Sequence, residues 1–366
     1  MDVTRFTHPI DLRAVSITDP FWQRETELVR REVIPYQWEA LNDRIPGAEK
    51  SWCMHNFRLA GRIMAQYRQQ GAQYTPQAYT YRGYDALPDD PAHPDEDKFY
   101  GFVFQDTDFS KWIEAVGYSL IQHPDKALEA TADEAIDVVC AAQTPEGYLD
   151  TYYIINGMDG VFQSLRDHHE LYCLGHLIEG AVSYYQATGK DKLLRAACRF
   201  ADYVADFFGT ADGQCKGYPG HEIAEMALVR LYEVTQDEKY LRLSRFFINE
   251  RGQEPNYFVE EERSNAEREH RPVRSVNLAY HQAVKPVREQ DEAMGHAVRA
   301  VYLYSGMADV ARMTGDDSLK SACERLWRSI VQEKLYITGG IGATQIGEAF
   351  SYAYDLPNDT AYSETC

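Results

Sequence analysis

The stretch YYQATGKDKLLRAACRF, residues 184–200, decides the fold because it combines a helix end, a short turn and a helix start. Gly189 stands where a helix commonly ends on a left-handed glycine. The stretches LYEVTQDEKYLRLSRFF (231–247) and VARMTGDDSLKSACERL (310–326) repeat the pattern, and Asp316 suits the first turn of a helix. The three stretches therefore predict helical hairpins joined by short turns.

Helical periodicity dominates the rest of the chain as well. Apolar residues recur at three- and four-residue steps, and strand-like alternation is nearly absent, so we expect an all-α fold. The spacing of the hairpin turns is irregular, which is unlike a solenoid with a fixed repeat. About ten helices in five hairpins are expected, at 21–42 and 54–69, 108–122 and 125–142, 169–187 and 190–208, 221–234 and 237–250, and 287–314 and 316–332.

Hairpins in this number predict a ring of inner and outer helices, an (α/α)6-barrel or helical-hairpin toroid. The tail from residue 333 onward is Gly-rich and loop-like, and it stops where an eleventh helix would begin. We therefore predict that residues 1–366 form a single incomplete barrel that lacks its last hairpin. The proline- and charge-rich stretches 78–107 and 251–286 are expected to be long loops, and long ordered loops are often functional.

Composition excludes several classes of partner. The 366 residues carry 37 Lys and Arg against 57 Asp and Glu, a formal net charge of −20, which disfavours nucleic acid and anionic membranes. No 18-residue apolar run and no secretory signal are visible. The seven cysteines are scattered and odd in number, which is not a disulfide framework. A reducing, cytoplasmic location is therefore predicted.

Histidines stand at the starts of alternate helices. The motifs RDHHELY, GYPGHEIAEMAL and EAMGHAVRAVYLY place His168 and His169, His221 and His296 there. In a hairpin ring the inner helices alternate and their N-termini share a face, so these side chains are expected to converge. Taken singly, each is typical of a hydrogen-bonded packing residue.

The tail adds Glu348, in IGEAF, and the pair Glu364 and Cys366, in YSETC. Glu348 alone is typical of a solvated loop carboxylate. Residues two apart in an extended chain point to one side, so Glu364 and Cys366 could share a metal ion. Two ligands do not complete a tetrahedral site, and the motif by itself is a weak metal signal.

Longer motifs resemble a known family. The stretches HELYCLGHLIEGAVSYYQATG, PGHEIAEMALVRLY, GHAVRAVYLYSGMADVA, VFQDTDFSKWIEAVGYSL and LYITGGIGATQIGEAFSYAYDLPNDTAYSETC together closely resemble the β-L-arabinofuranosidases of glycoside hydrolase family 127. The resemblance covers essentially the whole chain, in order. It implies an (α/α)6 barrel followed by β-sandwich domains, which are absent from this sequence.

The resemblance also implies a mechanism and a site. It assigns Glu348 as general acid/base, Glu364 and Cys366 as zinc ligands, and His169, His221 and His296 as residues that line the arabinose pocket. A zinc-bound cysteine thiolate would attack the anomeric carbon in a retaining hydrolysis of terminal β-L-arabinofuranosides. The implied partner is a glycan with terminal β-L-arabinofuranose, and a homodimer is expected of the full-length parent.

One departure from the family pattern affects the expected activity. The two remaining zinc ligands of the family, one of them the nucleophile, are an adjacent Cys-Cys pair, and this sequence has none. The fragment alone is therefore expected to be inactive, with an incomplete zinc site. Two alternatives stay open: a non-catalytic, truncated sugar-binding module, and a sugar epimerase on a similar helical ring with two histidines exchanging protons.

Overall fold

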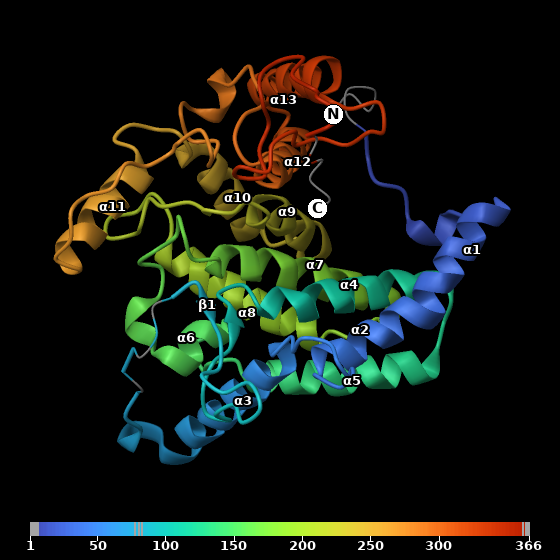
Figure 1. The fold of residues 1–366 in the computed structure, drawn as a ribbon, viewed down its shortest axis with the longest axis vertical. Coiled ribbons are helices and arrows are strands. Elements are labelled where there is room, and N and C mark those ends of the chain that lie inside the picture. Colours follow the sequence, from blue (N-terminus) through green and yellow to red (C-terminus); the bar gives the residue numbers. More distant parts are fainter. Residues whose placement is uncertain (1–6, 77, 80, 82, 361, 363–366) are drawn as a thin grey trace. The chain divides into compact units, whose positions relative to one another are not determined.

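The computed structural model describes residues 7–76, 78, 79, 81, 83–360 and 362, and it divides into two compact units (Figure 1). Unit 1 comprises Met1–Val161 with His176–Tyr203, and unit 2 comprises Phe162–Gly175 with Val204–Cys366. No helix among the described residues is long and apolar enough to cross a membrane.

Unit 1 consists of helices and one short hairpin. Its two strands are antiparallel, with Asp85 opposite Phe102 and Ala86 opposite Gly101. The larger parts of α7 (Glu170–Thr188) and α8 (Lys192–Phe207) belong to it. Its other elements are η1 (Leu12–Ala14), α1 (Pro20–Leu28), η2 (Val29–Val33), α2 (Ile34–Leu41), α3 (Cys53–Gln70), η3 (Gly71–Gln73), β1 (Asp85–Ala86), β2 (Gly101–Phe102), α4 (Asp106–Gln122), α5 (Lys126–Ala141), α6 (Thr151–Asn156) and η4 (Met158–Gly160).

Large aromatic side chains form the core of unit 1 around α3 and α4. Phe57 and Phe109 meet with ring centroids 5.8 Å apart, and Trp38 stacks on Trp112 at 4.6 Å. The indole N–H of Trp112 donates to the carbonyl of Ile34 at 3.1 Å. The largest buried ring therefore keeps a hydrogen bond, as buried indoles usually do.

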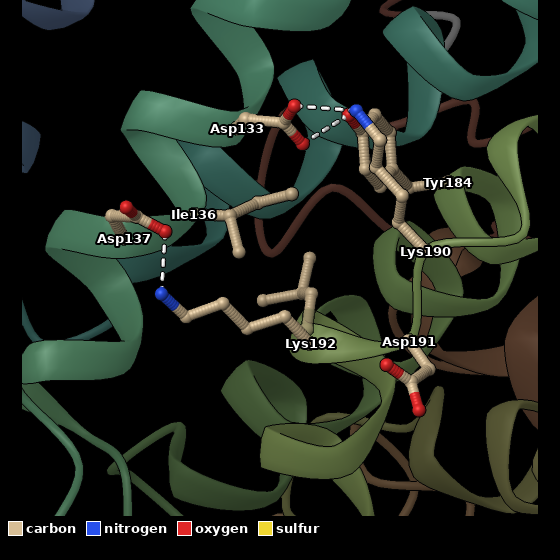
Figure 2. Close-up of a pocket in the computed structure, with 8 residues that line it drawn as sticks. Asp133, Ile136, Asp137, Tyr184, Lys190, Asp191 and Lys192 are labelled. Atoms are coloured by element: carbon tan, nitrogen blue, oxygen red, sulfur yellow. Dashed lines mark hydrogen bonds and ion pairs between the residues drawn. The ribbon is translucent and has the colours of Figure 1, made fainter.

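A surface pocket of about 280 Å³ lies between α5 and the α7–α8 turn of unit 1 (Figure 2). Both lysines of the pocket pair with aspartates that line it: Lys190 contacts Asp133 at 2.5 Å, and Lys192 pairs with Asp137. The hydroxyl of Tyr184 also donates to Asp133, at 2.8 Å. The pocket contains none of the site residues predicted from the sequence. Its polar side chains instead form contacts that hold α5 to the α7–α8 turn.

Unit 2 is built on α9, α10, α12 and α13, which appear as neighbouring helices in Figure 1. Helix α9 packs on α10 and α12, and α12 packs on α13, which buries Leu228, Phe247 and Leu303. Its elements are α9 (Ala224–Thr235), α10 (Glu238–Glu250), α11 (Tyr257–Arg268), η5 (Val287–Glu289), α12 (Ala297–Thr314), α13 (Asp317–Ser329) and η6 (Ile330–Lys334).

Aspartate side chains fix where many of these helices begin. An aspartate carboxylate accepts backbone N–H groups that the first turn of a helix leaves unpaired. Such caps stand before α1, α5, α6, α10 and α13, at Asp19, Asp125, Asp150, Asp237 and Asp316. Aspartates in the connecting segments therefore account for where these helices begin.

The all-α fold of helical hairpins is confirmed, with differences from the predicted elements. Helix α6 was not predicted, and the short strands β1 and β2 lie in the stretch 78–107, which was expected to be a loop. Helix α11 lies inside the stretch 251–286, which was expected to be a loop, and α12 begins at Ala297 rather than near 287. Helix α11 carries many charged residues and so lacks a clear apolar stripe. The assignment of residues 1–366 to a single domain stays a prediction.

Candidate active site

His296 stands immediately before α12 as its N-cap. Its Nδ1 accepts the backbone N–H of Arg299 at 3.4 Å, so the proton of the neutral ring lies on Nε2. Nε2 lies 3.0 Å from Oε2 of Glu348 and donates to it. The helix cap thus sets both the orientation and the tautomer of this histidine.

Glu348 comes from the loop that follows α13, and this loop is fastened to the start of α12. The N–H of Ala297 donates to the carbonyl of Glu348 at 3.0 Å, and the N–H of Phe350 donates to Gly295 at 2.9 Å. Phe350 packs in a buried cluster with Ala297. The Glu348 side chain stays 47% exposed, so a carboxylate anchored to the core remains accessible to a substrate.

The two oxygens of Glu348 have different partners. Oε2 accepts from His296, and Oε1 accepts the hydroxyl of Tyr362 at 3.3 Å. A half-exposed carboxylate held between a buried imidazole and a phenol has a defined orientation. Such a group can give and take a proton at a fixed position, as general acid/base catalysis requires.

His169 and His221 lie beside His296 within unit 2. The ring centroids are 5.5 Å apart for His169 and His221, and 5.6 Å apart for His221 and His296. Gly220 permits this approach, because a Cβ there would lie 2.1 Å from the carbonyl oxygen of Leu165. The structure therefore brings together the three histidines and Glu348 that the sequence predicted as site residues.

Hydrogen bonds also orient His169 and His221. Nδ1 of His169 donates to the carbonyl of Asp167 at 3.1 Å, and Nδ1 of His221 donates to the carbonyl of Glu222 at 3.0 Å. In the neutral rings, the lone pair is then on Nε2. The chemistry of the three rings thus differs, because His296 presents an Nε2–H donor where the other two present an acceptor nitrogen.

Burial keeps these histidines uncharged. Desolvation, followed by the charge of Arg299, lowers the pKa of His169 to about 3. The same two causes, in the same order, hold the pKa of His221 well below its ordinary value. Neutral imidazoles can exchange hydrogen bonds with hydroxyl groups without adding a positive charge to the site.

Aromatic side chains and an arginine that the sequence reasoning missed complete the cluster. Tyr172 lies 4.2 Å from His221, and Tyr280 lies 5.5 Å from His296, both measured between ring centroids. Tyr172 and Arg299 each follow a site histidine by three residues at a helix start, a spacing that could have indicated them. Tyr280 belongs to a loop, and no periodicity indicates it.

The proposed zinc ligands Glu364 and Cys366 lie outside the described residues. Within the part of the chain that is described, no group of three His, Cys, Asp or Glu side chains could hold a metal ion. The zinc assignment therefore stays a prediction from the sequence.

Comparison with known proteins identifies the family. Residues 14–366 match the sequence model of the β-L-arabinofuranosidase GH127 catalytic domain. The chain belongs to glycoside hydrolase family 127. This GH127 chain is 39% identical over 359 residues to a non-reducing end β-L-arabinofuranosidase of Bifidobacterium longum subsp. longum, covering 96% of the chain and 51% of that protein.

Solved structures of GH127 proteins agree with the assignment. Ara127N, a GH127 β-L-arabinofuranosidase from Geobacillus stearothermophilus T6, has a TM-score of 0.83 and 47% identity over 96% of this chain and 50% of its own. A second GH127 β-arabinofuranosidase has a TM-score of 0.79 and 40% identity over 98% of this chain and 49% of its own. The chain thus spans about half the length of these relatives.

Proposed function

We propose that this chain supplies the acid/base and the sugar-binding residues of a retaining β-L-arabinofuranosidase that removes terminal β-L-arabinofuranosyl residues from glycans. The observation that carries the proposal is the 3.0 Å contact between His296 and Glu348, in one cluster with His169 and His221. Membership of GH127 supports the choice of substrate. A cytoplasmic location and a homodimer stay predictions from the sequence.

In this proposal Glu348 transfers a proton in both chemical steps: cleavage of the glycosidic bond and release of the sugar by water. Its carboxyl group protonates the glycosidic oxygen as the bond to the leaving group breaks, while a cysteine thiolate, which would come from the Cys-Cys pair that this sequence lacks, would bond to the anomeric carbon. The resulting carboxylate then removes a proton from the water that releases the sugar. His296 and Tyr362 hold the two oxygens in place, so that one of them can reach the glycosidic oxygen.

The histidines would position the furanose ring. Nε2 of His221 can accept a sugar hydroxyl proton, because Nδ1 of that ring already donates to a backbone carbonyl. His169 lies beside it, with its ring oriented by the carbonyl of Asp167. Fixed donors and acceptors of this kind lower the entropic cost of reaching a reactive geometry. Tyr172 and Tyr280 add ring surfaces beside the histidines.

The implied zinc ion fits this chain only in part. Glu364 and Cys366 would offer a carboxylate and a thiolate, both of which zinc accepts, but a tetrahedral site needs four ligands. The sequence has no adjacent Cys-Cys pair to provide the others, and the described residues form no metal cluster. The residues of this chain therefore provide only part of a zinc site.

The proposal is tested by replacing Glu348 in the full-length protein and measuring hydrolysis of an aryl β-L-arabinofuranoside. Glu348→Gln keeps the shape of the side chain and removes its proton transfer, so kcat should fall by about 10²–10⁴-fold while KM changes little. Glu324→Gln, at a half-exposed position on α13, is the matched control and should leave both constants unchanged. Turnover at the wild-type rate by Glu348→Gln would refute the acid/base role.

A further inference from the structure

Arg299 links three segments that carry the histidine cluster. Its Nη1 donates to the carbonyl of Gly220 at 2.9 Å and to Nδ1 of His281 at 2.8 Å. Its guanidinium lies over the ring of Tyr280, 4.6 Å from the centroid. Its backbone N–H donates to Nδ1 of His296. One residue in the first turn of α12 thus holds the segment before His221, the loop at 280–281 and the helix cap.

The charge of Arg299 is unusual for its burial. The residue is 6% exposed, yet no carboxylate of the described residues lies within ion-pair distance of it, and its Nε has no hydrogen-bond partner there. By contrast, the buried Arg312 on the same helix pairs with Glu233 at 2.8 Å and with Asp309 at 3.1 Å. Among the described residues, Arg299 thus has hydrogen-bond acceptors and the ring of Tyr280 as partners but no carboxylate in contact, although its charge also acts on the buried Glu222. Burying a cation without a contacting carboxylate is costly, which favours a role for Arg299 beyond packing.

The charge of Arg299 acts on the surrounding imidazoles. After burial itself, Arg299 is the largest cause that lowers the pKa of His169, His221 and His281, the last to about 3. The other charged or titratable groups that act on these three rings are Asp167, His168, Arg251 and His296, besides the mutual action of His169 on His221. A fixed cation beside the cluster therefore favours neutral rings.

We propose that Arg299 is a positioning residue of this site: it clamps the Gly220–His221 segment to the start of α12 and fixes which ring nitrogens carry protons. Nδ1 of His281 lies 2.8 Å from Nη1 of Arg299 and 3.3 Å from the carbonyl oxygen of Gly220. Because a guanidinium always donates and the contact with Arg299 is the shorter one, we assign Nδ1 as the acceptor and the proton to Nε2. His296 is fixed in the same tautomer by the backbone N–H of Arg299. The effect on sugar binding rests on the proposed function, whereas the tautomer assignment does not.

The test is histidine ¹⁵N NMR of the full-length protein, compared between Arg299→Met and Arg312→Met. Both variants remove a buried arginine from α12, but only Arg299 contacts the histidine segments. In the wild type, His281 and His296 should show the Nε2–H tautomer, and His169 and His221 the Nδ1–H tautomer. In Arg299→Met, His281 should become a mixture of tautomers, and the titration midpoints of His221 and His281 should rise by about one pH unit or more.

Arg299→Lys separates charge from geometry. It should keep the low titration midpoints but lose the fixed His281 tautomer, because the ammonium of the shorter lysine side chain does not stand at the position of Nη1. If the proposed function holds, Arg299→Met should also lower kcat/KM by about 10–100-fold, mostly through KM, and Arg312→Met should not. Histidine spectra unchanged in Arg299→Met, or changed equally in Arg312→Met, would overturn the proposal. A wild type without hydrolytic activity would refute the proposed function and leave the NMR result valid.

Discussion

Glu348 shows at the residue scale how a reactive group can be held in an unfavourable backbone conformation. Its φ is +49°, directly after Gly347 at +73°, and a non-glycine residue rarely adopts such a value. Strain of this kind costs about 1–3 kcal/mol and persists where the surroundings impose it. The bonds from Ala297 to Glu348 and from Phe350 to Gly295 impose it here, and they tie the carboxylate to the helix that His296 caps.

The buried His168 predicts how the free energy of unfolding depends on pH. Burial lowers its pKa from 6.5 to about 4, with Asp167 opposing. Between pH 6.5 and 4 the unfolded chain therefore binds a proton that the folded chain does not, and stability falls as the pH falls. From pH 7.5 to pH 5, the wild type should lose about 2 kcal/mol more unfolding free energy than His168→Gln.

Urea unfolding of the wild type and His168→Gln at the two pH values measures this difference. Each protein serves as its own reference at pH 7.5, so a constant cost of the substitution cancels. Parallel losses in the two proteins would show that His168 binds its proton equally in the folded and unfolded states.

The histidines and Glu348 could be predicted because each belongs to a motif with a local position at a helix start or in the tail. Tyr280 belongs to a loop and could not be singled out in this way, whereas the spacing of Arg299 from His296 indicates its place at a helix start but not its partners. Their importance depends on contacts with each other and with residues far away in the sequence: Arg299 donates to the carbonyl of Gly220 and to Nδ1 of His281, and its guanidinium lies over the ring of Tyr280. No periodicity in the sequence encodes those contacts.

At the scale of a secondary-structure element, Asp316 shows how one side chain stabilises a hairpin turn. Its Oδ1 accepts the N–H of Leu319 at 3.0 Å, which caps α13, and its Oδ2 accepts from Arg288 at 2.7 Å. Asp316→Ala removes both contacts and should lower the unfolding free energy by about 1–2 kcal/mol. Asp316→Asn keeps a capping oxygen and loses the charge, so its cost should be at most about 1 kcal/mol.

Chemical denaturation of the two Asp316 variants compares the cap with the ion pair. The prediction requires Asp316→Asn to lie between the wild type and Asp316→Ala. Equal losses in the two variants would mean that the pair with Arg288, rather than the cap, stabilises this turn.

Helix α11 shows why hydrophobic periodicity does not predict every helix. Its Glu261 accepts the backbone N–H groups of Leu165 and Arg166 at 2.7 and 3.0 Å. Its Glu262 pairs with Arg271. The buried face of this helix contains Phe258 and Ala266 but also Glu261, Glu262 and Asn265. Because most of its buried positions are polar, the apolar periodicity that revealed the hairpins is missing here.

At the scale of the whole molecule, the two units are joined by continuous helices rather than by one linker. The division falls between Gly175 and His176, inside α7, and between Tyr203 and Val204, inside α8. The chain also passes from unit 1 to unit 2 after Val161. Neither unit is therefore a contiguous stretch of sequence, and unfolding either one must disrupt helices that the other shares.

Shared helices predict that the units unfold together. Melting of unit 2 would fray the first turn of α7, where Glu170 accepts the N–H of Phe162 at 3.0 Å, and would leave the remainder of that helix without its start. Differential scanning calorimetry should then show one transition, with a ratio of calorimetric to van 't Hoff enthalpy of about 1. Asp316→Ala, although its substitution lies in unit 2, should shift that single transition without splitting it. Two resolved transitions, with only one of them moved by Asp316→Ala, would show that the units unfold independently despite α7 and α8.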